Sequence, residues 1–112
     1  MENKISFEDF AKVEITNGKI LSADIIEGSE KLLKLMVDFK EETPRQIISG
    51  IRKYFPDEKV LIGKKCLFVT NLLPRTIFGH ESNGMLFAVS DDTGNFSLLE
   101  PLDAIAEGTK AG

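Results

Sequence analysis

Leu33-Lys34-Leu35-Met36-Val37-Asp38-Phe39 is the stretch that decides the fold class of this chain. Its leucines, valine and phenylalanine alternate strictly with lysine, methionine and aspartate. Alternate side chains of a strand point to opposite faces, so a period of two predicts a strand with one buried face. This is the clearest strand pattern in the sequence, and it favours a β-sheet fold.

Further strands are predicted on both sides of this segment. Val13 to Ile25 alternates more loosely, and Gly18 inside it indicates a bend or bulge. The other predicted strands are 45–50, 66–72, 85–90 and 96–99, with a hairpin turn at 91–95. Residues 102–112 read as an irregular tail.

Two short helical segments interrupt the strands. Ser6 is a suitable N-cap for a helix over residues 6–11, with Asp9 three positions later. A helical turn over residues 51–55 is stopped by Pro56. Five or more strands, a small helix between the third and fourth, and no βαβ periodicity predict an all-β, five-stranded Greek-key barrel of the OB-fold type.

Composition describes a single domain over residues 1–112, long enough to bury a core of its own. Its apolar runs are too short to cross a bilayer, and its polar start, Met1-Glu2-Asn3-Lys4-Ile5, lacks the character of a secretory leader. Cys66, the only cysteine, cannot form an intramolecular disulfide and is expected to be a small buried residue. These observations favour a cytoplasmic location and no membrane partner.

Charge is distributed unevenly along the sequence. The net charge is −4, yet residues 31–86 hold ten basic and six acidic side chains, and both ends are acidic. A basic middle between acidic ends is compatible with a polyanionic partner and equally with a solvated mixed surface.

After the strand-like run Cys66–Thr70 comes Asn71-Leu72-Leu73-Pro74-Arg75-Thr76-Ile77-Phe78-Gly79-His80-Glu81-Ser82-Asn83-Gly84-Met85-Leu86, which overlaps the ends of the predicted strands 66–72 and 85–90. It is read as a long loop, too rich in Leu, Ile and Phe to be disordered. An ordered loop with an arginine and with hydroxyl and amide donors suits contact with phosphates and base edges.

No pattern supports catalysis or a bound cofactor. The sequence lacks a Gly-rich phosphate loop, a His/Cys set with metal-ligand spacing and a nucleophile elbow. His80, the only histidine, has no local acid or cysteine pattern and is expected at the surface. We therefore predict a protein that is not an enzyme on its own, with no metal and no cofactor.

Four blocks of the sequence resemble a known family. They are Phe7–Val13 with Gly18-Lys19-Ile20, Glu27–Leu35, Arg45–Ile51, and the loop with its Asn-Leu-x-Pro-Arg and Ser-x-Gly-Met elements. In this order and spacing they resemble the tRNA-binding domain at the C-terminus of bacterial methionyl-tRNA synthetases, which also occurs as free-standing tRNA-binding proteins. Tyr54–Asp57 and Leu61–Gly63 resemble the synthetase-appended form more than the secretion-chaperone relatives.

The resemblance implies a domain that binds tRNA largely by shape and backbone and forms a homodimer. It also implies partnership with the catalytic part of methionyl-tRNA synthetase, in cis or in trans, whose His-Ile-Gly-His and Lys-Met-Ser-Lys-Ser signatures are absent here. Carried over, the RNA-contact positions are Ser49, Asn71, Arg75, Ser82 and Met85, supported by Lys31, Lys34 and Lys53. A wider positive field is expected to include Arg45, Arg52, Lys64 and Lys65.

Several of these residues have a second interpretation. Lys34 points away from the core and is equally well explained as merely solvated. Met85 opens a strand, so core packing competes with a ligand role, and Asn71 and Ser82 suit caps of the loop's own backbone. Arg75 has no acidic residue within four positions, which favours contact with RNA. The aromatics occupy mostly core-like positions, with no stacking ladder.

Three functions stay open at this point. The first is a tRNA-binding module, the second a peptide-binding, chaperone-like relative that uses the same loop groove, and the third a purely structural dimerisation module. Apolar residues near the ends of the chain are the candidates for a dimer contact: Ile5, Phe7, Phe10, Leu102, Ala104 and Ile105.

Overall fold

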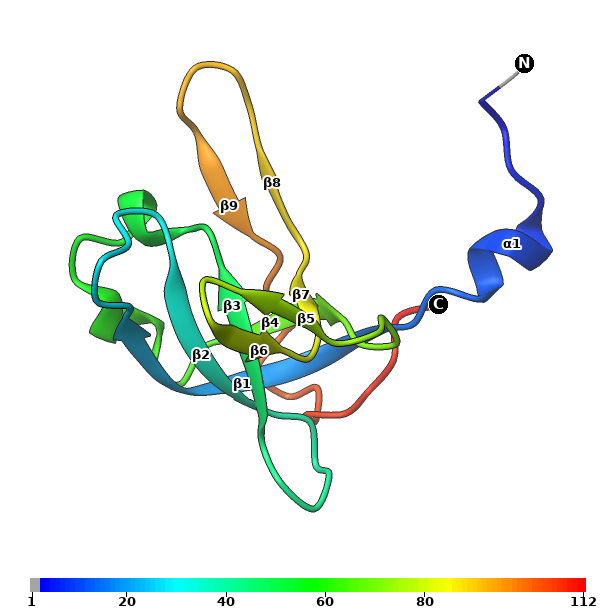
Figure 1. Cartoon of the computed structure of the whole chain (residues 1–112). Helices are drawn as coiled ribbons and strands as arrows, with labels where there is room; N and C mark the ends of the chain where they lie inside the picture. The colour runs from blue at the N-terminus through cyan, green and yellow to red at the C-terminus, as the bar shows by residue number, and fades with distance from the viewer. Residues whose placement is uncertain (1–2) are drawn as a thin grey trace.

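A computed structural model describes residues 3–112, so the polar start at Met1 and Glu2 lies outside the described residues. The chain is built mainly of short strands (Figure 1). The elements are α1 (Phe7–Ala11), β1 (Ile15–Ile25), β2 (Leu33–Asp38), β3 (Arg45–Ser49), β4 (Lys65–Val69), β5 (Arg75–Ile77), β6 (His80–Ser82), β7 (Met85–Leu86), β8 (Ala88–Ser90) and β9 (Phe96–Leu98). Two 3-10 turns, η1 (Arg52–Tyr54) and η2 (Glu58–Leu61), lie between β3 and β4.

Five strands form one antiparallel sheet in the order β3-β2-β1-β4-β7. The sheet curls into a nearly closed barrel, which confirms the predicted fold class and is consistent with an OB-fold. The alternation in β2 is confirmed as well, since its odd-numbered residues are buried and its even-numbered ones half-buried. The predicted helix between the third and fourth strands takes the form of the two 3-10 turns.

Strand β1 bends so that its two halves pair with different neighbours. Residues 15–19 pair with β4, residues 19–25 pair with β2, and only Lys19 has ladder partners on both sides. Gly18 is required by packing, because a Cβ there would lie 2.6 Å from Val37 Cγ1 and closer still to the Phe39 ring. The change of partner at Lys19 and the register irregularity between Ile20 and Ser22 lie within a few residues of Gly18, where a bend or bulge is predicted.

The tail covers the edge of β1 that the bend exposes. Thr16 forms an isolated bridge with Lys110, and the Asn17 and Ala111 amides donate to Thr109 and Ile15 carbonyls, each at 2.8 Å. The tail, residues 102–112, is irregular, as predicted, and backbone hydrogen bonds to β1 hold it in place. It supplies backbone partners to an edge that would otherwise lack them.

The barrel closes between β3 and the β6–β7 connection through individual hydrogen bonds. Ile48 N donates to Ser82 Oγ at 3.0 Å, and Asn83 N donates to the Gln46 carbonyl at 2.8 Å. The Gln46 side chain adds a bond to the Glu81 carbonyl at 2.9 Å. We call this contact the seam of the barrel.

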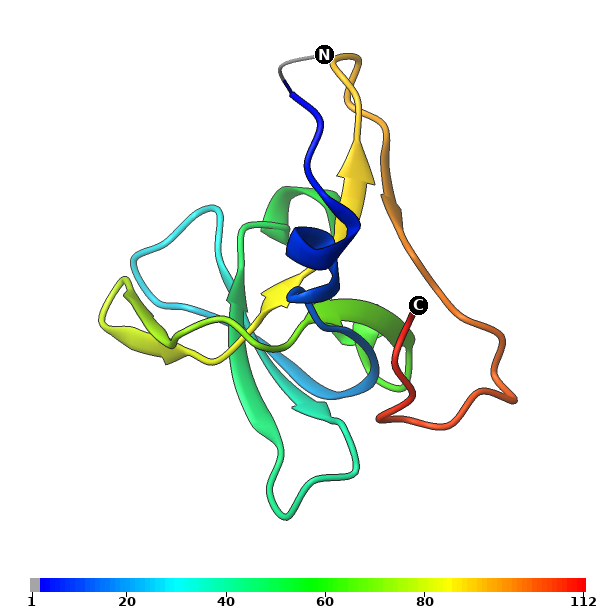
Figure 2. The same ribbon diagram turned by 90° about the vertical axis from the view of Figure 1, so that its right-hand side faces the viewer.

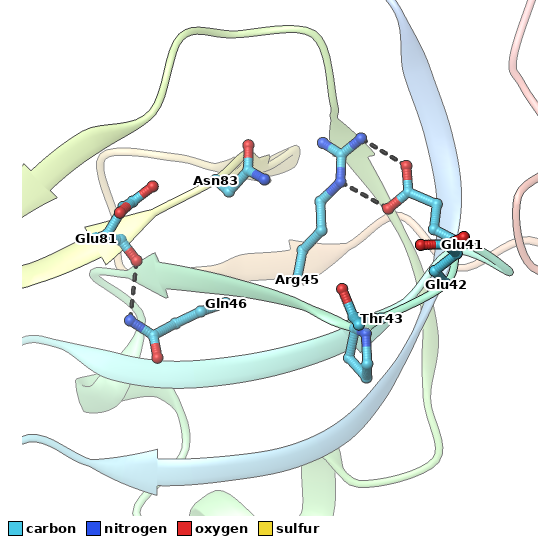
Figure 3. Close-up of a pocket in the computed structure, with 8 residues that line it drawn as sticks. Glu41, Glu42, Thr43, Arg45, Gln46, Glu81 and Asn83 are labelled. Atoms are coloured by element: carbon cyan, nitrogen blue, oxygen red, sulfur yellow. Dashed lines mark hydrogen bonds and ion pairs between the residues drawn. The ribbon is translucent and has the colours of Figure 1, made fainter.

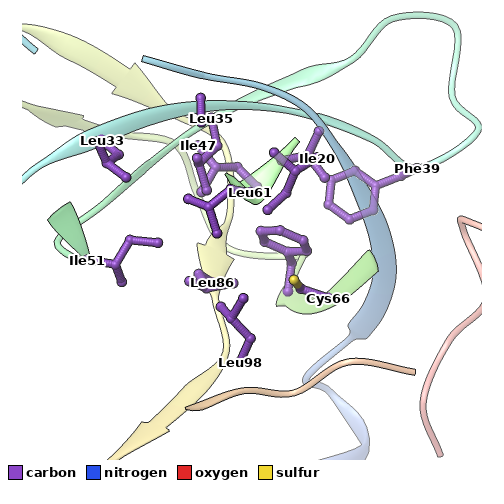
Figure 4. Packing of buried hydrophobic residues seen from close by; sticks show 13 residues of the cluster. Ile20, Leu33, Leu35, Phe39, Ile47, Ile51, Leu61, Cys66, Leu86 and Leu98 are labelled. Atoms are coloured by element: carbon purple, nitrogen blue, oxygen red, sulfur yellow. The ribbon is translucent and has the colours of Figure 1, made fainter. Parts of the chain in front are cut away.

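The core fills the barrel interior (Figure 4). Phe39 and Phe68 meet edge to face with ring centroids 5.4 Å apart. Cys66 is fully buried, as predicted, and burial raises the pKa of its thiol to about 12. The buried cluster is Ile20, Ala23, Leu33, Leu35, Val37, Phe39, Ile47, Ile51, Leu61, Cys66, Phe68, Leu86 and Leu98.

The region read as one long loop contains a hairpin, β5–β6, so that interpretation was wrong. Phe78 and Gly79 form its two-residue turn with φ of 53° and 80°. Sequence reasoning missed the hairpin because its strands have three residues each and its turn lacks Asn-Gly or Asp-Gly. The strand predicted at 85–90 is also divided at Phe87, where the chain leaves the barrel for a second hairpin, β8–β9.

Helix α1 stands apart from the barrel (Figure 1). Ser6 caps it as predicted, since its Oγ accepts from Asp9 N at 3.0 Å. None of its residues is buried, and Phe7 and Phe10 are 77% and 51% exposed. A five-residue helix with no packed face needs a partner surface or further chain to stabilise it.

Candidate nucleic-acid interface

A hollow of about 80 Å³ lies between the β5–β6 hairpin and the barrel wall. It brings together three of the five predicted contact residues, which are Arg75, Ser82 and Met85. Its other lining residues are mainly apolar: Ile48, Leu72, Leu73, Ile77 and Gly84. The hairpin creates the hollow, because it folds back over β3 instead of extending into solvent.

Arg75 begins β5 directly opposite Ser82 and is exposed at the rim of the hollow. Its guanidinium forms no ion pair or hydrogen bond with any of residues 3–112. A planar fork with five unused donors can hold a phosphate bidentately or stack on a base.

Ser82 and Met85 occupy the hollow differently. Ser82 is 3% exposed, and its hydroxyl accepts from Ile48 N and donates to the Gly84 carbonyl at 3.1 Å. Met85 is 45% exposed, so its side chain belongs to the surface and not to the core. Contact of Ser82 with RNA stays a prediction, while its contribution to the seam is visible in the structure.

Asn71 connects the start of this region to the N-terminal segment. Its side-chain amide donates to the Lys12 carbonyl, and its oxygen accepts from Glu14 N at 2.8 Å. The expected cap of the loop's own backbone is replaced by bonds to a segment 57 to 59 residues away. Asn71 therefore holds the chain that leads from α1 into β1 against the base of the hairpin.

The remaining predicted residues do not line this hollow. Ser49 ends β3 beside Ile48, and Lys34 is the ladder partner of Ile48 on the outer face of β2. Lys31 is exposed in the β1–β2 connection, and Lys53 in η1 carries its ammonium 5.0 Å from the Tyr54 ring centroid. Within residues 3–112, Lys31, Lys34 and Lys53 form no ion pairs.

Other cations have partners of their own. Lys64 pairs with Glu100 at 3.5 Å, and Lys65 pairs with Glu107 at 3.4 Å. Arg45 forks onto Glu41 at 2.7 and 2.8 Å (Figure 3). Its guanidinium also donates to the Thr70 carbonyl and lies 5.4 Å from the Phe39 ring centroid. The prediction that Arg45, Lys64 and Lys65 join a positive field was therefore wrong. Their acidic partners come within reach only when the chain folds.

On the other side of the seam lies a second, wider hollow of acidic character (Figure 3). Glu41, Glu42 and Glu81 line it, together with Thr43, Pro44, Arg45, Gln46 and Asn83. The hydrogen bond from Arg45 holds the pKa of Glu41 below its usual value, so this carboxylate stays charged at neutral pH. Phosphates are disfavoured here, and the seam thus separates an acidic surface from one with unpaired cations.

Comparison with known proteins identifies the family of the chain. A family described as "Putative tRNA binding domain" matches residues 15–110. The chain belongs to this family. It is similar to a methionine–tRNA ligase of Methanoregula boonei, with 54% identity over 107 residues, covering 95% of this chain and 15% of the ligase. The chain thus spans about 15% of the length of the curated relatives it matches.

Two solved structures extend the similarity to the whole tRNA-binding domain. A MetRS-related protein from Pyrococcus horikoshii has a TM-score of 0.91 and 33% identity, covering 98% of this chain and 99% of its own. The chaperone CsaA of Bacillus anthracis has a TM-score of 0.85 and 26% identity, covering 97% and 99%. The same fold is therefore found in one protein named as related to MetRS and in another named as a chaperone.

The tRNA-binding domain also has an exposed aromatic residue that sequence reasoning missed. Phe78 was grouped with core-like aromatics, but its side chain is 56% exposed at the tip of the β5–β6 hairpin. The signal that could have found it is its position directly before Gly79, in a turn flanked by short strands.

Within residues 3–112, no three His, Cys, Asp or Glu side chains converge in a way that could hold a metal ion. Helices among these residues are all too short to cross a bilayer. His80 is half-buried in β6, not fully exposed as expected.

Proposed function

We propose that this domain is a non-catalytic module that binds tRNA on the surface formed by the β5–β6 hairpin, the outer face of β2 and the β1–β2 connection. The observation that carries the proposal is the guanidinium of Arg75 at the rim of the hollow, which is unpaired among the described residues. Lys34 lies on the same outer face as the ladder partner of Ile48, and Lys31 lines a neighbouring open hollow at the hairpin tip. Family membership gives the chemical class of the partner.

Such a surface recognises mainly the sugar-phosphate backbone of the tRNA. Arg75 holds a phosphate at the rim, the lysines add a positive field, and Met85 offers a soft apolar contact to an unstacked base. Asn71 and Ser82 act on RNA chiefly by fixing the hairpin, and Ser49 offers a hydroxyl beside the hollow. Few side chains here read base edges, so discrimination among tRNAs should be small.

The decisive experiment measures binding of purified domain to tRNA as salt is varied. Log K should fall by about 0.7–0.9 per contacted phosphate for each tenfold rise in salt. Arg75→Ala should weaken binding by roughly 1.5–3 kcal/mol with little change in melting temperature. Arg75→Lys should restore only part of the loss, because the planar fork is absent.

Lys110→Ala is the matched control. It also removes one exposed cation, but Lys110 pairs with Glu14 on the tail side of β1. Its tRNA affinity should stay near that of the wild type. Equal losses of tRNA affinity in the two variants would mean that only the net charge of the domain matters. An affinity that does not change with salt would contradict the proposal altogether.

We further propose that the domain serves methionyl-tRNA synthetase, attached to its catalytic part or associated with it. The support is the name shared by the relatives at 40–54% identity and the small share of their length that this chain spans. Joined to the catalytic part, the domain should lower the KM for tRNA. A KM unaffected by the domain would reject the assignment.

A homodimer is proposed on the exposed apolar residues at the two ends. Ile5, Phe7 and Phe10 are 67%, 77% and 51% exposed, and Leu102 is 78% exposed. A symmetry mate would cover these residues and raise apparent affinity by making a second RNA contact intramolecular. Light scattering at low micromolar concentration tests this, and a mass near 12.4 kDa would reject it.

A peptide-binding function is the second candidate. The hollow has an apolar rim, with Leu73 88% exposed and Met85 beside Arg75, and a structural relative is named a chaperone. If this function holds, an unfolded apolar peptide should displace bound tRNA. Binding of tRNA unaffected by saturating peptide would leave the RNA function alone on this surface.

A further inference from the structure

The turn of the β5–β6 hairpin has a residue that local chemistry disfavours. Both central positions, Phe78 and Gly79, have positive φ. Two-residue turns of this kind strongly prefer Asn-Gly or Asp-Gly, because a bulky side chain in the left-handed region is strained. Apart from Phe78, the only non-glycine residue with positive φ among residues 3–112 is Lys40.

Burial of the Phe78 ring does not explain this choice. The side chain is 56% exposed at the hairpin tip, and it belongs to no part of the core cluster. Both views place the tip beside the β1–β2 connection (Figures 1 and 2). The ring lies next to Gly28, where even an added Cβ would come to 3.6 Å from it. This is an ordinary van der Waals distance, so the exposure of the ring does not depend on the glycine.

An open hollow separates the ring from the β1–β2 connection. Phe78 lines it together with Gly28, Ser29, Glu30, Lys31 and Leu32. Lys31 is exposed and unpaired among the described residues, and Glu30 is the one acid on the rim. The Phe78 ring can contact a flat ligand group such as a base, and the Lys31 ammonium can bind a negative charge attached to that group.

The wall opposite the ring is held firmly. Ser29 is 9% exposed, and its hydroxyl accepts from Lys31 N at 3.3 Å and Leu32 N at 3.1 Å. Arg52 adds two bonds, from its backbone N to the Lys31 carbonyl at 3.1 Å and from its guanidinium to the Ser29 carbonyl. A site preformed in this way loses little entropy when a ligand binds.

We propose that Phe78 is a stacking platform for one unpaired base of the bound tRNA, with Lys31 receiving an adjacent phosphate. The proposal rests on the tRNA-binding function argued above and adds to it a residue that reads exposed single-stranded nucleotides. Bases stack on aromatic side chains without regard to sequence. A strained aromatic residue, exposed where asparagine would suit the turn better, is the pattern expected when function overrides local stability.

Phe78→Asn separates this role from a structural one. Asparagine suits the left-handed position, so the melting temperature should be unchanged or higher. The affinity for tRNA should fall roughly tenfold. Phe78→Tyr should keep the wild-type affinity, and Val89→Asn, a control at a 52% exposed position of the other hairpin, should not alter it. A lower melting temperature for Phe78→Asn, or unchanged affinity, would overturn the proposal.

Fluorescence gives a direct readout, because the chain has no tryptophan. The indole introduced by Phe78→Trp should be quenched when tRNA is added, as a base stacks on it, while the one introduced by Val89→Trp should not. Unchanged emission from Phe78→Trp while tRNA is bound would reject stacking and leave the proposed function intact. Failure of the wild type to bind tRNA would instead reject the proposed function.

Discussion

The two hairpins of this domain, β5–β6 and β8–β9, differ in where their stability comes from. β5–β6 lies against the barrel and is tied to β3 by the bonds at Glu81 and Ser82. β8–β9 packs on the barrel at its base, through Leu98 of the core cluster and through Phe96, whose ring stacks on Tyr54 with centroids 4.3 Å apart. Its turn projects away from the barrel (Figure 1) and is held by its own hydrogen bonds. There the Asp91 carboxylate accepts from the backbone and side chain of both Thr93 and Asn95.

This difference shows how local sequence relates to tertiary support. The β8–β9 turn uses aspartate, threonine, glycine and asparagine, each suited to turns. The β5–β6 turn uses Phe78 at a strained position, which is affordable because the barrel holds the hairpin from outside. The hairpin with the poorer turn is the one that carries Arg75 and lines the hollow. Its departure from local rules marks the surface proposed to bind RNA.

The largest expected effect is a difference in the free energy of unfolding between two variants, each of which replaces one serine in one of the hairpins. Ser82→Ala leaves the buried Ile48 N–H without a partner and should lower the free energy of unfolding by about 1–3 kcal/mol. Ser97→Ala removes one bond from an exposed side chain to the Leu98 carbonyl and leaves no buried N–H without a partner, so it should change the free energy of unfolding by less than about 0.5 kcal/mol. Urea unfolding of both variants measures the difference. Similar losses would show that the seam does not depend on Ser82.

A smaller effect is expected from acid on the β8–β9 turn. The side-chain bonds from Asn95 and Thr93 lower the pKa of Asp91 to about 2, below the unfolded value of roughly 3.9. A depressed pKa stabilises the folded chain above the unfolded pKa, and this contribution is lost as pH falls through the folded value. The stability difference between wild type and Asp91→Asn should therefore be greatest above pH 4 and shrink toward pH 2.

Thermal unfolding of wild type and Asp91→Asn between pH 2 and pH 6 tests this prediction. The stability contributions of carboxylates that both proteins share cancel in the difference. A stability difference between wild type and Asp91→Asn that is constant with pH would mean that Asp91 does not stabilise the turn through its charge. Glu41 provides an internal check. Its depressed pKa follows from Arg45, so its contribution should appear equally in both proteins.

The smallest effect concerns local opening, reported by Cys66. Burial and a pKa of about 12 should keep its thiol unreactive toward a disulfide reagent at pH 8 until the barrel opens. Ser82→Ala should speed labelling by weakening the seam, whereas Asp91→Asn should leave the rate unchanged. Faster labelling in Asp91→Asn would mean that the two hairpins open together with the barrel.

The sequence by itself determined the features that depend on neighbouring residues. Period two predicted β2, Ser6 predicted the start of α1, and Gly18 predicted the bend in β1. Four ordered blocks indicated the family, and Arg75 and Met85 were predicted as contact residues before the hollow that they share was known. Periodicity, capping and bends are properties of short windows, so local pattern suffices for them.

Only the tertiary structure decided which partners distant residues have. Asn71 bonds to a segment 57 to 59 residues away, Ser82 closes the seam with β3, and Arg45 meets Glu41 and Thr70 instead of joining a positive field. The same folding exposed Phe78 at the tip of a hairpin whose three-residue strands give no period to read. Such contacts form when the barrel closes, and closure joins residues that no local window contains.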